Sequence, residues 1–175
     1  IHKTDLGGVR LEVATGQEVE DAYDLMMLRL GKLAPRAIIE GVYVEKMADR
    51  GLEVIVGMTR DPQFGPMFMF GLGGIFVEVM KDVTFHLAPI TEDEAVQMLK
   101  STRSYEMLKG KRGQKEADIP AIAMALQRIS QLTTDFPQIA ELDINPMIVG
   151  EIGTEPVVAD ARMTLRELKV QPHQE

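Results

Sequence analysis

The chain of 175 residues has a formal net charge of −8 and a sequence pI of about 5.0, which argues against nucleic acid or an anionic membrane as its main partner. It contains no cysteine, so thiol catalysis, disulfides and cysteine-zinc sites are excluded. Hydrophobic residues make up 45% of the chain, enough for one sizeable core, but no run approaches the ~20 apolar residues of a membrane span. Because no signal peptide is visible, we expect a cytoplasmic chain. We also expect residues 1–170 to form one domain and residues 171–175 to form a tail.

The first segment joins polar residues to a glycine pair, Gly7 and Gly8, and then alternates polar with apolar residues over residues 9–13. The alternation predicts a short strand. Consecutive glycines let a backbone approach a phosphate and direct N–H groups at it, although a simple turn is their commoner meaning. Since Ile1 stands directly before this motif and is not a methionine, we expect the chain to be a fragment of a longer protein.

A helix is predicted after Thr15, because Thr15 and Glu18 have the spacing of a capping box. Apolar residues then recur at helical spacing, which predicts that one face of the helix packs in the core. These residues are Val19, Ala22, Tyr23, Met26, Leu30 and Leu33.

Two extended segments, residues 41–47 and 52–59, flank a predicted turn at residues 48–51. The end of such a strand could offer backbone groups to an adenine edge, and a carboxylate shortly downstream could bind ribose hydroxyls. Glu45 and Glu53 are placed for this role, but a plain hairpin with surface carboxylates is equally compatible with the spacing.

Residues 71–74 contain three glycines, and two further strands are predicted at residues 75–80 and 83–87. Such glycine density suggests a close approach of the backbone to a ligand. The Rossmann pattern of strand, glycine-rich turn and helix is absent, and so is the Gly-Lys-Ser/Thr ending of a P-loop.

Thr91 and Glu94 form a second capping-box pattern, which predicts a helix reaching Ser101. The basic run at residues 109–115 could receive phosphate or a CoA-like polyanion, although a solvated loop is the commoner meaning of such a run. Pro120 then begins a further predicted helix with an apolar face.

Residues 141–147 and 157–162 are the most informative stretch, because both alternate like strands around a polar turn. A hairpin closed about residues 152 and 153 sets Asn145 opposite Asp160, since 152 minus 145 equals 160 minus 153. An amide and a carboxylate oxygen suit Mg²⁺, which takes few protein ligands and completes its shell with phosphate and water. The alternative is a solvated acidic strand, and spacing alone favours that alternative.

Several motifs, taken in order, resemble the ATP-grasp domain of NDP-forming acyl-CoA ligases. The related proteins are the ADP-forming acetate–CoA ligases, the protein lysine acetyltransferases fused to such a module and, more distantly, the β subunit of succinyl-CoA synthetase. The resemblance extends from Ile1 to about Leu165. The motifs are His-Lys-Thr-Asp-Leu-Gly-Gly-Val (2–9), Glu-Val-Ile-Val-Gly (53–57), Arg-Asp-Pro-Gln-Phe-Gly-Pro (60–66), Phe-Gly-Leu-Gly-Gly-Ile-Phe-Val-Glu (70–78), Arg-Gly (112–113), Glu-Leu-Asp-Ile-Asn-Pro (141–146) and Asp-Ala-Arg (160–162).

This resemblance implies an α+β (α/β) chain with the C-terminal part of an ATP-grasp fold: a mainly antiparallel sheet packed by helices, with an incomplete upstream subdomain. It implies an ADP-forming acid–CoA ligase, active only within a larger protein or complex. ATP/ADP and Mg²⁺ are the implied cofactors, with CoA in the complete enzyme. The implied partners are CoA-binding and phosphohistidine domains and a small carboxylic acid, with no nucleic acid or membrane.

The resemblance also assigns catalytic roles. Asn145 and Asp160 correspond to the Mg²⁺ ligands, and Asp143 to the acid that faces the phosphohistidine. His2 corresponds to a second phosphoryl-carrying histidine, for which a neutral imidazole is a suitable nucleophile. A loop histidine that orients Asp5 is the alternative for His2.

For the nucleotide, the resemblance implies that Gly7 and Gly8 end the phosphate-side loop. Glu45 and Met47 correspond to the adenine hinge, acting through backbone atoms, and Glu53 to the ribose-binding acid. Two other classes of function stay open: a regulatory nucleotide- or CoA-sensing module of a protein acetyltransferase without ligase activity, and a purely structural domain.

Overall fold

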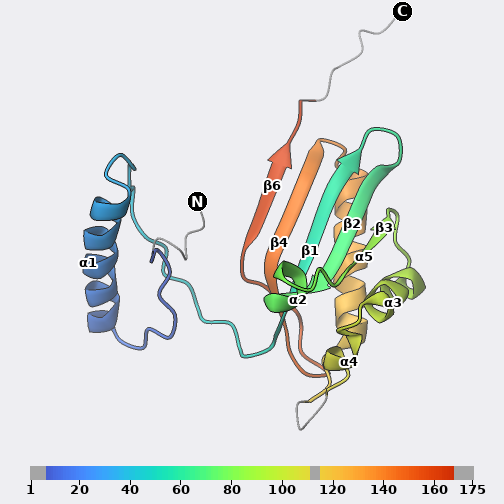
Figure 1. The fold of residues 1–175 in the computed structure, drawn as a ribbon, viewed down its shortest axis with the longest axis horizontal. Helices are drawn as coiled ribbons and strands as arrows, with labels where there is room; N and C mark the ends of the chain where they lie inside the picture. The colour runs from blue at the N-terminus through green and yellow to red at the C-terminus, as the bar shows by residue number, and fades with distance from the viewer. Residues whose placement is uncertain (1–6, 111–114, 168–175) are drawn as a thin grey trace, which may run out of the picture. The chain divides into compact units, whose positions relative to one another are not determined.

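The computed structural model describes residues 7–110 and 115–167 (Figure 1). The chain divides into two compact units, residues 1–47 and residues 48–175, which are described separately below. In the described ranges, no helix has the length and apolar character needed to cross a membrane.

The first unit contains one long helix, α1 (Gly16–Leu33), as the capping pattern predicted. The Thr15 hydroxyl accepts a hydrogen bond from the N–H of Glu18 at 3.2 Å. The carboxylate of Glu18 accepts from the N–H of Ala14, one residue before the cap, at 2.8 Å. The cap is therefore present with its reciprocal bond displaced by one residue.

Two predictions for the first unit are wrong. No residue of α1 reaches the core: its apolar face is at most half-buried, and Tyr23 and Leu33 on that face are 41% and 60% exposed. Residues 9–13 and 41–47 form no strand. A strand needs a neighbour for its N–H and C=O groups, and both edges of the strand beginning at Leu52 are already paired with other segments. The plain hairpin between residues 41–47 and 52–59, left open by their spacing, therefore does not form.

The second unit contains a six-stranded antiparallel sheet in its described part, ordered β3-β2-β1-β4-β5, with β6 also pairing with β4 (Figure 1). This is the mainly antiparallel sheet that the sequence predicted. Its strands are β1 (Leu52–Asp61), β2 (Gly65–Leu72), β3 (Val83–Leu87), β4 (Ile139–Val149), β5 (Val157–Val158) and β6 (Ala161–Leu165).

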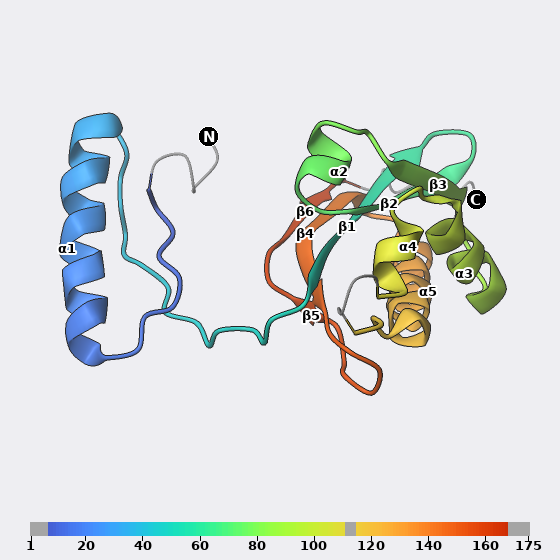
Figure 2. The same ribbon diagram turned by 60° about the horizontal axis from the view of Figure 1, so that its bottom comes forward.

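Helices cover one face of this sheet. The views in Figures 1 and 2 agree that α5 (Ile119–Asp135) and α3 (Glu92–Ser101) lie on that face, with α4 (Tyr105–Leu108) beside them. Both predicted helices are confirmed: Thr91 and Glu94 form the full capping box of α3, and Asp118 caps α5 with Pro120 in its first turn. The core lies between the two layers and includes Val54, Val56, Phe68, Phe70, Leu99 and Leu126.

The glycine-rich run ends in a short helix, α2 (Ile75–Glu78), so the strand predicted at residues 75–80 is wrong. An added Cβ at Gly71 would lie 2.8 Å from Val77, and one at Gly73 would lie 3.1 Å from Glu53. The N–H of Gly73 donates to the carbonyl of Glu53 at 2.7 Å. The close approach that the glycines indicated therefore exists, but among the described residues it is made to the chain's own backbone and side chains.

Candidate functional site

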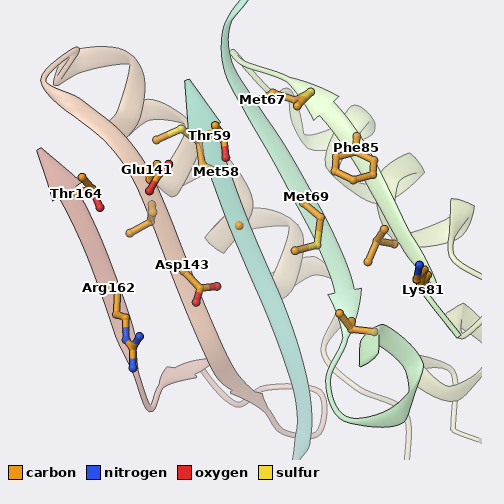
Figure 3. A pocket seen from close by; sticks show the side chains of 14 residues that line it. Met58, Thr59, Met67, Met69, Lys81, Phe85, Glu141, Asp143, Arg162 and Thr164 are labelled. Atoms are coloured by element: carbon orange, nitrogen blue, oxygen red, sulfur yellow. The ribbon is translucent and has the colours of Figure 1, made fainter. Parts of the chain in front are cut away.

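The face of the sheet away from α3 and α5 carries a hollow of about 630 Å³, here called the open-face hollow (Figure 3). One side of it is apolar and comes from β2, β3 and α2, whereas the other side is charged and comes from β4 and β6. Its lining residues include Met67, Met69, Val77, Lys81, Val83, Phe85, Glu141, Asp143, Arg162 and Thr164.

Strand β4 supplies the acidic side through the alternation that its sequence predicted. Glu141, Asp143 and Asn145 are exposed, while Leu142 and Ile144 are buried. A register shift in the pairing of β1 with β4 lies just after Ile144. Strict alternation would direct Pro146 into the core, but the shift places Met147 there instead. Such a bulge changes which residues face the core without ending the strand.

The hairpin that carries the predicted metal ligands has the predicted register. Met147 pairs with Val158 across β4 and β5, and Ile144 pairs with Ala161 across β4 and β6. Between these pairs, the N–H of Asn145 donates to the carbonyl of Asp160 at 3.0 Å. The predicted opposition of these two residues is therefore confirmed at the level of the backbone.

The chemistry of this pair fits a divalent cation. Asn145 is exposed, Asp160 is half-buried, and both offer the hard oxygen donors that Mg²⁺ prefers. The described residues contain no cluster of three or more histidine, cysteine, aspartate or glutamate side chains able to hold a metal. An ion bound here would thus take few protein ligands and leave positions for phosphate oxygens, as Mg²⁺ commonly does.

Sequence reasoning missed two cations of the open-face hollow. Arg162 stands opposite Asp143 in the β4–β6 register, and Figure 3 shows both side chains on the open face. Lys81 lines the hollow from the other side. No ion pair joins Asp143 to Arg162 in the described structure, so both charges are available to a ligand. The hairpin register could have found Arg162, because the same turn that opposes Asn145 and Asp160 also opposes these two residues.

A buried carboxylate supports the rim of the open-face hollow beside Lys81. Asp82 accepts hydrogen bonds from the N–H groups of Arg103 at 2.8 Å and Ser104 at 2.7 Å. Burial alone raises the pKa of Asp82, but the hydrogen bonds from Ser104 and Arg103 and the charge of Arg103 outweigh it, so the pKa is lowered. This carboxylate ties the start of β3 to the turn after α3.

Glu53 lies at the start of β1 and is exposed. Because side chains alternate along a strand, it shares the open face with Gly57 and Thr59, which line the hollow. The structure therefore brings Glu53 to the same face as the acidic strand, at the other end of β1.

The remaining predicted nucleotide residues belong to the first unit. Gly7 has a φ of +69° and borders a hollow of about 290 Å³ together with Arg29. Gly8 is half-buried, whereas Glu45 and Met47 are exposed in a segment without regular secondary structure.

His2 and residues 111–114 of the basic run lie outside the described residues. The flanking Lys109 pairs with Glu106 at 3.0 Å, and Lys115 pairs with Glu151 at 2.6 Å. These two lysines are thus engaged with carboxylates, which agrees better with a solvated loop than with a polyanion site.

Comparison with known proteins extends the resemblance. Residues 1–165 match the family model described as an ATP-grasp domain. The chain is 50% identical over 167 residues to the ADP-forming acetate–CoA ligase I of Archaeoglobus fulgidus, covering 95% of this chain but 24% of that protein. It is 44% identical over 165 residues to the β subunit of the corresponding enzyme I of Pyrococcus furiosus, covering 94% of this chain and 70% of that subunit. The chain thus spans about a quarter of the single-chain Archaeoglobus relative.

Solved structures agree. A dinucleotide-forming acetyl-coenzyme A synthetase 1 from Ca. Korarchaeum cryptofilum, in complex with coenzyme A and Ca-AMPCP, matches with a TM-score of 0.88 and 43% identity, over 95% of this chain and 72% of that one. A second structure of that protein holds coenzyme A and Mg-AMPPCP, with its phosphohistidine segment pointing towards the nucleotide binding site; it matches with a TM-score of 0.80 and 40% identity, over 95% of this chain and 71% of that one. The chain therefore belongs to the ATP-grasp family, in the form that makes up the β-subunit region of ADP-forming acyl-CoA ligases.

Proposed function

We propose that this chain is the ATP-binding portion of an ADP-forming acyl-CoA ligase of the acetate–CoA type, active within a larger protein or complex. The observation that carries the proposal is the hairpin register, which opposes Asn145 to Asp160 beside the pair Asp143 and Arg162. The names of the relatives support the same reaction class. The partners would be CoA-binding and phosphohistidine domains with a small carboxylic acid, in the cytoplasm, where ATP and CoA are available.

Asn145 and Asp160 would hold Mg²⁺ through their side-chain oxygens. The bound ion would neutralise charge on the terminal phosphates of ATP and help to orient them. Arg162 and Lys81 add positive charge along the open-face hollow, which suits a phosphoryl group in transfer.

Asp143 would accept a hydrogen bond from one ring N–H of the reacting histidine. This leaves the lone pair of the other ring nitrogen for the phosphoryl group. That nitrogen forms a bond to the γ-phosphorus while the bond from this phosphorus to the β–γ bridging oxygen breaks, and ADP leaves with the electron pair. We propose His2 as the phosphoryl carrier on this chain and a histidine of the partner domain as the other.

Further residues would hold the nucleotide itself, each in the role that the resemblance gives it. Gly7 and Gly8 would offer backbone N–H groups to its phosphates. Glu45 and Met47 would contact adenine through backbone atoms, since the described structure does not commit their segment to a sheet. Glu53 would bind the ribose hydroxyls.

The substitution Asp160→Ala in the intact protein tests the metal assignment. We expect Mg²⁺-dependent ADP formation to fall by about a hundredfold or more, since loss of a carboxylate ligand removes the charge that holds the ion. Circular dichroism should report an unchanged fold, because Asp160 lies outside the core. Undiminished turnover would exclude Asp160 as a ligand.

Labelled ATP separates the ligase from a regulatory module. Incubation of the intact protein with ATP labelled in its γ-phosphate should yield a phosphoenzyme that is labile in acid and stable in base, as expected for a phosphohistidine. A protein that binds Mg-ATP without forming this species would be a sensor rather than a ligase.

A further inference from the structure

The turn between β4 and β5 is held by the start of helix α5. The N–H of Gly153 donates to one carboxylate oxygen of Asp118 at 2.6 Å, while the other oxygen accepts from the N–H of Ala121 at 2.9 Å and caps α5. The N–H of Asp118 also donates to the carbonyl of Gly150 at 3.1 Å. A single side chain thus links the first turn of a packed helix to the tip of the hairpin.

This tip determines the register of the whole hairpin. The N–H of Thr154 donates to the carbonyl of Glu151 at 3.0 Å, which closes a four-residue turn. Counting outward from Glu151 and Thr154 in equal steps leads to the pairs Ile148 with Val157 and Met147 with Val158, and then to Asn145 with Asp160. The same count continues along β6 as far as Glu141 with Thr164. The position of Gly153 therefore fixes which residue stands opposite Asn145.

At its far end the returning arm is held by Arg166, whose N–H donates to the carbonyl of Gln138 at 2.8 Å and whose Nε donates to the carbonyl of Pro137 at 3.2 Å. Between that end and the turn, its register depends on the pairing with β4. In the described sheet, β5 and β6 pair with β4 alone, and every residue of both strands is exposed. Register is strongly specified where one face of a strand is buried and weakly specified where neither face is. A slip of one residue would turn each side chain of the arm to the other face. Asp160 lies on this arm, between β5 and β6.

We propose that Asp118 is a positioning residue for the divalent-cation site of Asn145 and Asp160. Its carboxylate holds Gly153 in place and so prevents the returning arm from slipping along β4. This inference rests on the proposed function, because it takes that pair to be the cation site. Asp118 would act on the pair through the turn.

The substitution Asp118→Ser tests the proposal in the intact protein. Serine is as good a helix cap as aspartate, so α5 keeps its first hydrogen bond, but its shorter side chain has one oxygen and cannot also hold Gly153. Glu151→Gln is the matched control at the same turn, because it removes only the exposed ion pair with Lys115. Thr91→Ala removes the cap of α3 and controls for a general loss of stability.

Two measurements are needed: amide hydrogen exchange at Gly153 and Asn145, and the Mg²⁺ concentration that gives half-maximal ADP formation. Asp118→Ser should speed exchange at both amides and raise that Mg²⁺ concentration about tenfold, in the range found when residues supporting metal ligands are lost. Both controls should leave the two quantities as in the unsubstituted protein.

The outcomes separate this inference from the proposed function. If Asp160→Ala abolishes the Mg²⁺ dependence while Asp118→Ser changes neither measurement, the role of Asp118 is wrong and the cation site stands. If Asp160→Ala has no effect, the cation site is wrong and the positioning role falls with it, whatever the exchange rates of Asp118→Ser show about the turn. Equal effects of Thr91→Ala and Asp118→Ser would also overturn the inference, since both would then reflect stability alone.

Discussion

Two regions of this chain have the sequence pattern of a hairpin, residues 41–59 and residues 141–164, but only the second forms one. Both have two strand-like segments around a turn. They differ in their surroundings: β1 already pairs with β2 on one edge and β4 on the other, so no edge is open to residues 41–47. In the second region, one edge of β4 pairs with β1, the other edge receives β5 and β6, and Asp118 holds the turn before them. A strand-like sequence therefore forms a strand only where the edge of a neighbouring strand is available for pairing.

A matched pair of truncations should give the largest contrast between the two regions. Ile144 in β4 is 5% exposed, whereas Val44 is 71% exposed. We expect Ile144→Ala to lower the free energy of unfolding by about 2–5 kcal/mol, because it leaves a cavity in the core. Val44→Ala should change it by less than about 0.5 kcal/mol. Urea denaturation measures both, and equal losses would mean that residues 41–47 are packed like β4.

Asp82, like Asp118, accepts backbone hydrogen bonds from a distant turn, here the turn after α3. We therefore expect Asp82 to contribute to stability. Asp82→Asn should cost about 1–3 kcal/mol of unfolding free energy, because the amide keeps only one of the two acceptor oxygens and none of the negative charge. The measurement is urea denaturation at neutral pH, with Asp93→Asn as an exposed control.

The same carboxylate predicts the direction of acid sensitivity. Since the pKa of Asp82 is lowered in the folded state, its stabilisation is complete above the pKa of the unfolded chain, near 4, and is lost as the pH falls through the folded pKa. Below about pH 4, the free energy of unfolding of the unsubstituted protein should therefore no longer exceed that of Asp82→Asn. A stability difference that stays constant down to pH 2 would contradict this account.

The smallest expected effect compares the caps of two helices. Thr91→Ala removes the cap of α3, whose residues Ala95, Met98 and Leu99 are buried in the core. It should lower the unfolding free energy by about 1 kcal/mol. Thr15→Ala removes the same bond from α1, none of whose residues is fully buried, so the main unfolding transition should not move. A shift of similar size in both variants would show that α1 is coupled to the second unit.

The sequence by itself determined the features that depend on near neighbours. The starts of α1 and α3 followed from threonines that bond to an N–H three residues later, and the start of α5 followed from Pro120. The opposition of Asn145 and Asp160 followed from counting outward from a turn, because a hairpin's register is set locally. The family likewise followed from short motifs whose order the chain preserves.

Only the tertiary structure decided which segments found partners. Residues 9–13 and 41–47 were both predicted as extended segments, yet neither forms a strand. The edges of β1 are occupied instead by β2 and by β4, which is remote in the sequence. Residues 75–80 are a second case, since the glycines before them let this stretch fold back onto β2 as a helical turn. The open-face hollow also depends on the tertiary structure. Lys81 and the acidic residues of β4 are remote in the sequence, and they line one hollow because the sheet places β2 and β1 between β3 and β4.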